Sequence, residues 1–184
     1  SHANSEIGFI QSDDSTKIYY KLTKPAKTAT KTPIVVYVYG GPGVQKVKNE
    51  WSSMVVQLFA QNGFGVLELD NRGSSNRGRS FEQPIYKSLG GVEIEDQLSG
   101  LDMLKEIDWA DSENVGIFGH SYGGYMTLMG LCQSTRFRAG VSVAPVSDWR
   151  LYDTHYTERY MGLPIDNDEG YAKSNVINQI HALK

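Results

Sequence analysis

Short apolar runs alternate with amphipathic stretches along the middle of the chain. Residues 33–39 (Pro-Ile-Val-Val-Tyr-Val-Tyr) form a nearly continuous β-branched and aromatic run, which is typical of a strand covered on both faces. Similar runs predict further strands at residues 65–69, 115–118 and 139–146. Apolar side chains at helical spacing predict helices at residues 51–61, 92–107 and 122–132. This alternation predicts an α/β fold with a mostly parallel sheet and helices on both faces.

The flanks of this region carry weaker patterns. Residues 7–11 and 17–22 predict two short strands joined by a polar turn, and residues 24–31 predict an exposed connector. Residues 74–91 form a long polar loop. After residue 149 we find no strand pattern, and residues 176–183 favour a helical stretch. One apolar face is predicted for the first helix, made of Trp51, Met54, Val55, Leu58 and Phe59.

Composition excludes only a few kinds of site and partner. The 184 residues suffice for a single domain, and 40% hydrophobic with 21% charged residues is ordinary for a globular protein. Cys132 is the only cysteine, which excludes an intrachain disulfide and a cysteine-based zinc site. A net charge of −3 gives no reason to expect nucleic acid as a partner. No run is long enough to span a membrane, and no signal peptide opens the chain.

The start of the chain, residues 1–5 (Ser-His-Ala-Asn-Ser), is polar and is interpreted as a possible cloning remnant. Periplasmic, secreted and cytoplasmic locations are all compatible with one unpaired cysteine. The localisation is therefore left open.

The strongest chemical signal is the run Gly119-His120-Ser121-Tyr122-Gly123. A predicted strand precedes it and a predicted helix follows it, as the Gly-x-Ser-x-Gly nucleophile turn of hydrolases requires. Small residues two before and two after the serine allow the sharp turn that exposes its hydroxyl. We therefore identify Ser121 as the nucleophile, and we interpret His120 as a packing residue beneath the turn.

Four segments together resemble the prolyl oligopeptidase family of serine peptidases, and the last is most similar to its dipeptidyl peptidase IV branch. They are residues 38–43 (Val-Tyr-Gly-Gly-Pro-Gly), 70–74 (Asp-Asn-Arg-Gly-Ser), 119–125 (Gly-His-Ser-Tyr-Gly-Gly-Tyr) and 144–164, which contains Ala-Pro-Val-Ser-Asp-Trp and Tyr-Thr-Glu-Arg-Tyr-Met-Gly-Leu-Pro. The resemblance runs from about residue 8 to the end. It implies an α/β-hydrolase fold and no cofactor or metal.

The resemblance also implies roles for individual residues. Ser121 would attack the scissile carbonyl, while the backbone amide of Tyr122 and the hydroxyl of Tyr39 would bind the oxyanion. One such donor is typically worth about 2.7–4 kcal/mol of transition-state stabilisation. The residue before the cleaved bond, proline or alanine, would lie in an apolar pocket formed with the Tyr122 ring by Val146, Trp149, Tyr152 and Tyr156.

Aromatic walls suit the compact apolar ring of proline. Trp149, Tyr152 and Tyr156 stand at near-helical spacing, so one helix face could present all three. Spacing alone leaves a second interpretation, in which they are core residues. Asp70 and Arg72 are predicted to form a structural, charge-assisted pair.

A general base for Ser121 is hard to find in the sequence. In hydrolases of this fold the acid and then the histidine follow the serine along the chain. His155 and His181 follow Ser121, and neither matches the position of the family's histidine. The acids after Ser121 lie in the pocket segment or in a loop: Asp148, Asp153, Asp166 and Asp168. We therefore expect a single, partial domain (residues 1–184) that is truncated before its acid and base, and poor or no hydrolysis by the isolated chain.

Three functions remain open at this stage. The first is a peptidase that releases Xaa-Pro or Xaa-Ala dipeptides from peptides with a penultimate proline or alanine. The second is an oligopeptidase, tripeptidyl peptidase or acylaminoacyl peptidase of the same family. The third is a hydrolase-fold binding module without catalysis. The parent protein could be a homodimer with an N-terminal β-propeller, as the resemblance suggests.

Overall fold

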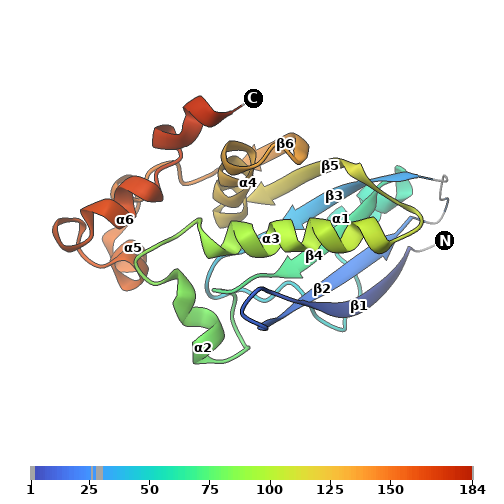
Figure 1. Cartoon of the computed structure of the whole chain (residues 1–184), viewed down its shortest axis with the longest axis horizontal. Helices are drawn as coiled ribbons and strands as arrows, with labels where there is room; N and C mark the ends of the chain where they lie inside the picture. The colour runs from blue at the N-terminus through green and yellow to red at the C-terminus, as the bar shows by residue number, and fades with distance from the viewer. Residues whose placement is uncertain (1–2, 26, 28–30, 184) are drawn as a thin grey trace.

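The apolar runs form one mixed sheet in the computed structural model, which describes residues 3–25, 27 and 31–183 (Figure 1). The strand order is β1-β2-β4-β3-β5-β6. The strands are β1 (Asn4–Gln11), β2 (Lys17–Lys24), β3 (Thr32–Val38), β4 (Gly65–Asp70), β5 (Ala110–His120) and β6 (Phe137–Val143). Of residues 1–5, the first two lie outside the described residues, Ala3 precedes β1, and Asn4 and Ser5 are the first two residues of that strand.

The register of the central strands determines where the loops meet. β3 pairs in parallel with both β4 and β5, and β5 pairs in parallel with β6. β1 and β2 add an antiparallel edge. The carboxyl ends of β3, β4, β5 and β6 therefore lie at one end of the sheet, which is where ligands bind in open α/β sheets.

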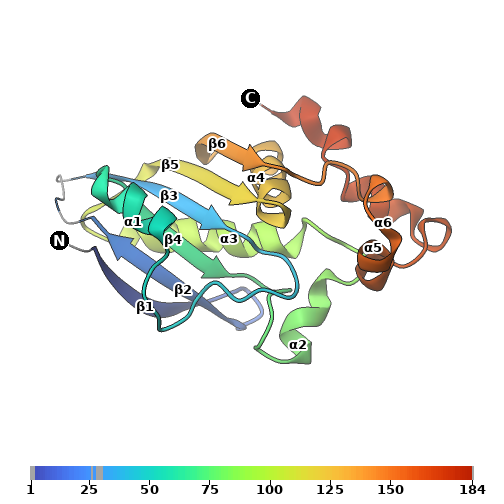
Figure 2. The same cartoon turned by 180° about the vertical axis from the view of Figure 1, so that it is seen from behind.

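Helices cover both faces of the sheet. Figures 1 and 2 show α1 on one face, α3 and α4 on the other, and α5 and α6 beyond the carboxyl ends of the parallel strands. The α-helices are α1 (Met54–Gln61), α2 (Arg79–Glu82), α3 (Val92–Met103), α4 (Tyr122–Gln133), α5 (Thr154–Met161) and α6 (Asp168–Lys173). Short 3₁₀ turns are η1 (Gln83–Ile85), η2 (Leu104–Glu106), η3 (Trp149–Leu151), η4 (Pro164–Asp166) and η5 (Ile177–Ala182).

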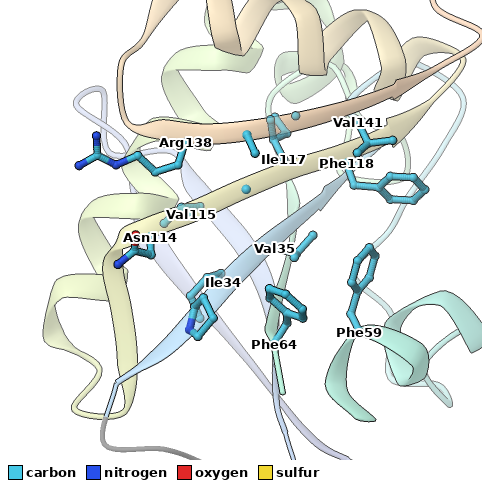
Figure 3. Close-up of a pocket in the computed structure, with 14 residues that line it drawn as sticks. Ile34, Val35, Phe59, Phe64, Asn114, Val115, Ile117, Phe118, Arg138 and Val141 are labelled. Atoms are coloured by element: carbon cyan, nitrogen blue, oxygen red, sulfur yellow. The ribbon is translucent and has the colours of Figure 1, made fainter. Parts of the chain in front are cut away.

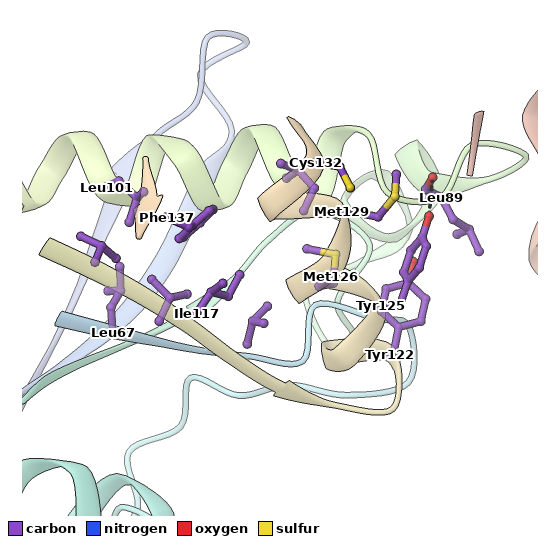
Figure 4. Packing of buried hydrophobic residues seen from close by; sticks show 14 of the residues in the cluster. Leu67, Leu89, Leu101, Ile117, Tyr122, Tyr125, Met126, Met129, Cys132 and Phe137 are labelled. Atoms are coloured by element: carbon purple, nitrogen blue, oxygen red, sulfur yellow. Dashed lines mark hydrogen bonds between the residues drawn. The ribbon is translucent and has the colours of Figure 1, made fainter. Parts of the chain in front are cut away.

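The main core lies between α4, α3 and the sheet (Figure 4). Met126 and Met129 of α4 belong to the same cluster as Ile117 of β5 and Leu101 of α3, and all four side chains are buried. Burying one such side chain contributes about 1.5–3 kcal/mol. Because α4 begins at the residue after Ser121, this packing also fixes the serine turn.

The predicted fold class and the order of strands and helices are confirmed, with shifted boundaries. The polar loop at residues 74–91 contains α2 and η1, and the stretch at residues 176–183 contains the 3₁₀ turn η5. Between β6 and residue 183 the described chain forms no strand, as predicted. Residues 26 and 28–30 of the predicted connector lie outside the described residues; Lys27 and Lys31 are exposed.

The predicted apolar face of the first helix is wrong. The helix begins at Met54, after the cap residue Ser53, and its buried positions are Val56 and Ala60. Met54 and Leu58 are 89% and 60% exposed. Six of the helix's eight residues are apolar, so the pattern alone could not show which side faces the sheet.

The face of the sheet that carries α1 has an apolar hollow beside that helix (Figure 3). Phe59 and Phe64 border it on one side, and Val141 of β6 borders it on the other. Ser121 and the predicted pocket residues are not among the residues that line it. The hollow is therefore separate from the serine turn.

Candidate active site

Ser121 stands at the junction between β5 and α4 in a strained backbone conformation. Its φ of 59° and ψ of −118° lie outside the regions that side-chain-bearing residues favour. Two hydrogen bonds hold this conformation. The Ser121 amide donates to the Val143 carbonyl at 2.9 Å, and the Tyr125 amide donates to the Ser121 carbonyl at 3.0 Å. Strand β6 and helix α4 thus hold Ser121 in the turn.

The glycines around Ser121 are required by close backbone contacts. A Cβ on Gly119 would overlap the carbonyl of Gly123, and a Cβ on Gly123 would overlap the carbonyl of Val38. A Cβ on Gly124 would lie 2.7 Å from the Val143 carbonyl oxygen. The ends of β3 and β6 therefore lie directly against the serine turn. This is why the turn requires small residues on either side of Ser121.

Tyr39 follows β3 directly and lies beside the same turn. Its Cα would be 3.1 Å from a Cβ on Gly123. The next residue, Gly40, is held from β4, because the Asn71 side-chain amide donates to the Gly40 carbonyl at 2.8 Å. Burial, together with the nearby Tyr152 and Tyr160, raises the pKa of the Tyr39 hydroxyl. Tyr39 therefore keeps its proton and can donate a hydrogen bond.

Tyr122 is the first residue of α4, so its backbone N–H has no partner within the helix. Its ring is 2% exposed and lies against the backbone of Gly41, where any Cβ would overlap it. The ring centroid is 6.0 Å from that of Tyr39 and 5.4 Å from that of Trp149. One side chain thus contacts the loop after β3 and the aromatic segment after β6.

The aromatic residues after β6 gather above the carboxyl end of the sheet. The rings of Trp149 and Tyr156 stack with centroids 6.0 Å apart and an interplanar angle of 18°. Tyr152 contacts both edge-on, at 5.9 Å and 5.5 Å. Trp149 is 1% exposed and Tyr152 is 43% exposed, so the cluster runs from core to surface. Val146 is half-buried and packs against the core.

The three aromatic rings do not share one helix, contrary to the prediction from their spacing. Trp149 lies in η3, Tyr152 follows that turn, and Tyr156 lies in α5. Two side-chain caps, Asp148 and Asp153, begin η3 and α5 as separate helical segments. Asp148 accepts from the Arg150 amide at 3.0 Å, and Asp153 accepts from the Tyr156 amide at 2.8 Å.

The aromatic segment is also tied to the turn that follows α6. The Asn175 side chain donates to Asp148 at 2.8 Å, and the Val176 amide donates to the Ser147 carbonyl at 3.0 Å. Asp148 and Asp153 thus already have structural hydrogen bonds. Asp168 pairs with Arg150 at 2.8 Å on the surface.

None of the histidine side chains in the described residues forms a hydrogen bond with Ser121. His155 is exposed and bonds to Arg159 through Nε2 at 2.8 Å, and His181 is exposed. His120 is exposed as well, so the interpretation of it as a packing residue is wrong. Alternation along β5 places His120 on the same side as Phe118, the side that α1 covers only in part. Across residues 3–25, 27 and 31–183, no side chain forms a hydrogen bond with the Ser121 hydroxyl.

The predicted pair of Asp70 and Arg72 does not form. Asp70 pairs with Arg77 at 2.7 Å and accepts from the Lys46 and Val47 amides. Arg72 turns toward α3, where its guanidinium binds Asp96 at 2.7 Å. Both residues are structural, as predicted, but each has a different partner.

Sequence reasoning missed one residue that contacts this site. Glu93, in the first turn of α3, is fully buried and accepts a hydrogen bond from the Tyr122 hydroxyl at 2.7 Å. Its position could have indicated this, because Glu93 and Gln97 continue the buried face formed by Leu101 and Leu104. A carboxylate on a buried helix face requires partners.

The described residues contain no cluster of three or more His, Cys, Asp or Glu side chains suited to holding a metal ion. Among them we also find no helix with the length and apolar character needed to cross a membrane.

Comparison with known proteins gives consistent matches. A family model described as the prolyl oligopeptidase family matches residues 50–184. Dipeptidyl peptidase 8 of Mus musculus is 42% identical over 181 residues, which cover 95% of this chain and 20% of that protein. Probable dipeptidyl peptidase 4 of Emericella nidulans is 40% identical over 167 residues, covering 88% of this chain and 22% of that protein.

Solved structures give the same result for the fold. A putative dipeptidyl aminopeptidase IV from Bacteroides ovatus has a TM-score of 0.95 and 40% identity, and dipeptidyl peptidase 4 from Porphyromonas gingivalis has a TM-score of 0.93 and 33% identity. Each match covers 100% of this chain and 27% of the solved chain. The chain therefore spans about a fifth to a quarter of the length of the relatives it matches.

Proposed function

The chain belongs to the prolyl oligopeptidase family, and from this premise we propose that it carries the nucleophile of a serine peptidase that cleaves after proline or alanine. The observation that carries the proposal is the position of Ser121, at a φ of 59° on a turn whose glycines admit no side chain, beside a cluster of aromatic rings. We further propose that the peptidase releases Xaa-Pro dipeptides from the N-termini of peptides.

The proposed chemistry is acyl transfer. The Ser121 hydroxyl gives its proton to a general base and attacks the carbonyl of the residue before the scissile bond. The peptide C–N bond then breaks, the amine leaves with that proton, and water hydrolyses the acyl-enzyme to the acid and free Ser121. The Tyr122 backbone N–H and the Tyr39 hydroxyl donate hydrogen bonds to the oxyanion of the tetrahedral intermediate. Two features support these roles: the Tyr122 amide is free of helical partners, and burial keeps Tyr39 protonated.

The proposed pocket for proline is formed by the aromatic cluster. Tyr152 and Tyr156 provide its accessible walls, Val146 adds an aliphatic side chain, and the Tyr122 ring forms the side next to Ser121. Buried Trp149 supports these rings from below, which is consistent with its 1% exposure. An apolar ring without a hydrogen-bond donor suits such walls, because it leaves no buried polar group unpaired.

We propose that the general base and its acid come from sequence outside these 184 residues. Two observations support this: no described histidine side chain forms a hydrogen bond with Ser121, and the matched relatives are four to five times longer. The other candidates are His155 and His181. If the 184 residues alone hydrolyse a glycyl-prolyl amide at ordinary peptidase rates, one of these two histidines is the base. Negligible turnover by the 184 residues supports a general base in another part of the full-length protein.

The decisive experiment uses the full-length protein that carries this sequence. We expect a fluorophosphonate probe to label Ser121 and glycyl-prolyl p-nitroanilide to be hydrolysed. Ser121→Ala should abolish labelling and lower kcat by at least about 10⁴-fold. Ser99→Ala is the matched control, because its hydroxyl lies on the surface of α3 and donates to the Glu95 carbonyl within the same helix.

Different amide substrates distinguish the remaining candidate functions. An N-terminally acetylated alanyl-prolyl amide should not be cleaved by a dipeptidyl peptidase, whereas an oligopeptidase would cleave it. Cleavage of tripeptidyl or acylaminoacyl amides alone would favour those members of the family. A full-length protein whose Ser121 does not react with the probe would contradict the catalytic proposal and favour a binding module.

A further inference from the structure

We propose that Glu93 is a positioning residue for the active site, which holds the Tyr122 ring, and with it the amide beside Ser121, in the geometry needed for proline-directed cleavage. This inference rests on the proposed function and deepens it. Glu93 lies on α3, and none of the catalytic or pocket roles proposed above belongs to a residue of that helix.

Hydrogen bonds hold both oxygens of the Glu93 carboxylate. Both of its oxygens accept: one from the Gly90 amide at 3.0 Å and from the Tyr122 hydroxyl at 2.7 Å, the other from the Gly91 amide at 3.0 Å. Three donors converge on a side chain with 0% exposure. The carboxylate therefore has one fixed orientation, and it transmits that orientation to the Tyr122 hydroxyl.

The Tyr122 ring is enclosed by its neighbours. The ring lies against the Gly41 backbone and 5.4 Å from both Trp149 and Tyr125, measured between centroids. The Tyr125 hydroxyl is held from the same side, because it donates to the Leu89 carbonyl at 3.1 Å (Figure 4). Residues 89–93 therefore anchor the first two aromatic rings of α4, the helix that begins after the nucleophile.

Only one residue, Tyr122, separates Glu93 from the proposed reacting groups. The Tyr122 ring and the Tyr122 amide belong to one residue, which follows Ser121 directly. A shift of the ring therefore moves one wall of the proposed pocket and the proposed oxyanion donor together. The direction of the hydrogen bond is also fixed, because burial and the nearby Glu93 raise the pKa of Tyr122 well above its ordinary value. The phenol therefore keeps its proton and donates it in a hydrogen bond to Glu93. Burial raises the pKa of Glu93 as well, and the Gly90 amide and the Tyr122 hydroxyl oppose that rise.

A purely structural interpretation gives the Glu93 carboxylate one role, which is to accept from the Gly90 and Gly91 amides just before α3. That interpretation predicts a loss of stability upon substitution, with unchanged catalysis by the molecules that remain folded. A positioning role predicts a loss of kcat in folded protein and a weaker preference for proline over alanine.

The test compares variants of the full-length protein. Glu93→Gln keeps the size of the side chain but turns one acceptor into a donor, and Tyr122→Phe removes only the hydroxyl. Displacement of a positioned group by about 1 Å can cost 10²-fold in rate, so we expect each variant to lose roughly tenfold or more in kcat, with a smaller change in KM. The double variant should lose little more than either single one, because both break the same interaction.

Glu95→Gln is the matched control, since it neutralises an exposed carboxylate in the same helical turn. The folded fraction of every variant is checked by thermal unfolding and circular dichroism. If Glu93→Gln does not fold, Tyr122→Phe decides the question.

Each outcome has a defined meaning. Folded Glu93→Gln or Tyr122→Phe with wild-type kcat and wild-type preference for proline over alanine overturns the inference and leaves the proposed function intact. Additive losses in the double variant also overturn it. A wild-type protein that hydrolyses neither prolyl nor alanyl amides overturns the proposed function, and the inference with it.

Discussion

The carbonyl group of Gly123 occupies the space that a Cβ on Gly119 would need. Because one glycine precedes Ser121 by two residues and the other follows it by two, this contact closes the nucleophile turn. Its effect can be tested by adding a single methyl group.

We expect Gly119→Ala to destabilise the protein by about 1–3 kcal/mol or more, since backbone atoms must move to make room. It should also abolish labelling of Ser121 by a fluorophosphonate. Gly116→Ala is the control on the same strand, because a Cβ there would have its nearest neighbour at 3.6 Å, an ordinary contact. Thermal unfolding and probe labelling give the two readouts, and normal labelling of Gly119→Ala would contradict the role of this contact.

Tyr39→Phe should lower kcat in the full-length protein by about 10²–10³-fold, the usual effect of losing one oxyanion donor. KM should change little, because the hydrogen bond strengthens as the oxyanion develops. An unchanged kcat would remove Tyr39 from the oxyanion site.

The raised pKa of Tyr39 predicts a pH dependence. The folded pKa lies above the ordinary value of about 10, so the hydroxyl remains a donor up to and beyond that pH. Its contribution to stability is fully present below pH 10 and is lost as the pH rises through the folded pKa. We therefore expect the activity ratio of wild type to Tyr39→Phe to stay constant from pH 6 to about pH 10. A ratio that falls between pH 7 and pH 9 would mean that Tyr39 ionises earlier.

Trp149 and Tyr152 should respond differently to truncation. Trp149→Ala removes a 1% exposed indole and should cost about 3–5 kcal/mol of stability. Tyr152→Ala removes a 43% exposed ring, so we expect a small loss of stability together with a higher KM for prolyl amides. Thermal unfolding and steady-state kinetics distinguish the two effects, and equal losses of stability would contradict this division of the cluster.

Asp96→Asn should destabilise the protein by about 3–5 kcal/mol, because it leaves the Arg72 guanidinium without its buried partner. Asp102→Asn on the same helix is the control, since the Asp102 side chain is 59% exposed and its pairs with Lys105 and Arg136 lie at the surface. We expect it to cost less than about 1 kcal/mol. A similar shift in unfolding temperature for both variants would show that burial does not set the strength of the Arg72–Asp96 pair.

The sheet and the serine turn could be predicted because their signals are local. The run from Ile34 to Val38 favours a buried strand wherever it is placed, and the glycines around Ser121 mark a steric requirement of the turn itself. The face of α1 could not be predicted, because apolar residues surround most of that helix. Only the position of the sheet determines that Val56 is buried and Met54 is exposed.

The sequence pattern does not show which residues distant from one another in the chain become partners. Asp70 and Arg72 are close in sequence, yet the turn after β4 points Asp70 toward Arg77 and Arg72 toward α3. Glu93 and Tyr122 are 29 residues apart and meet because α3 and α4 pack on the same face of the sheet. The aromatic cluster was expected from a resemblance, but its division between η3 and α5 depends on the caps Asp148 and Asp153.

The positive φ of Ser121 has a consequence for how this protein could evolve or be engineered. Glycine adopts such a conformation without strain, so replacing the nucleophile with glycine would relieve backbone strain. Selection for thermostability alone would therefore favour loss of the nucleophile, whereas selection for peptide turnover would retain it. A library screened only for heat resistance should accumulate inactive, well-folded molecules at this position.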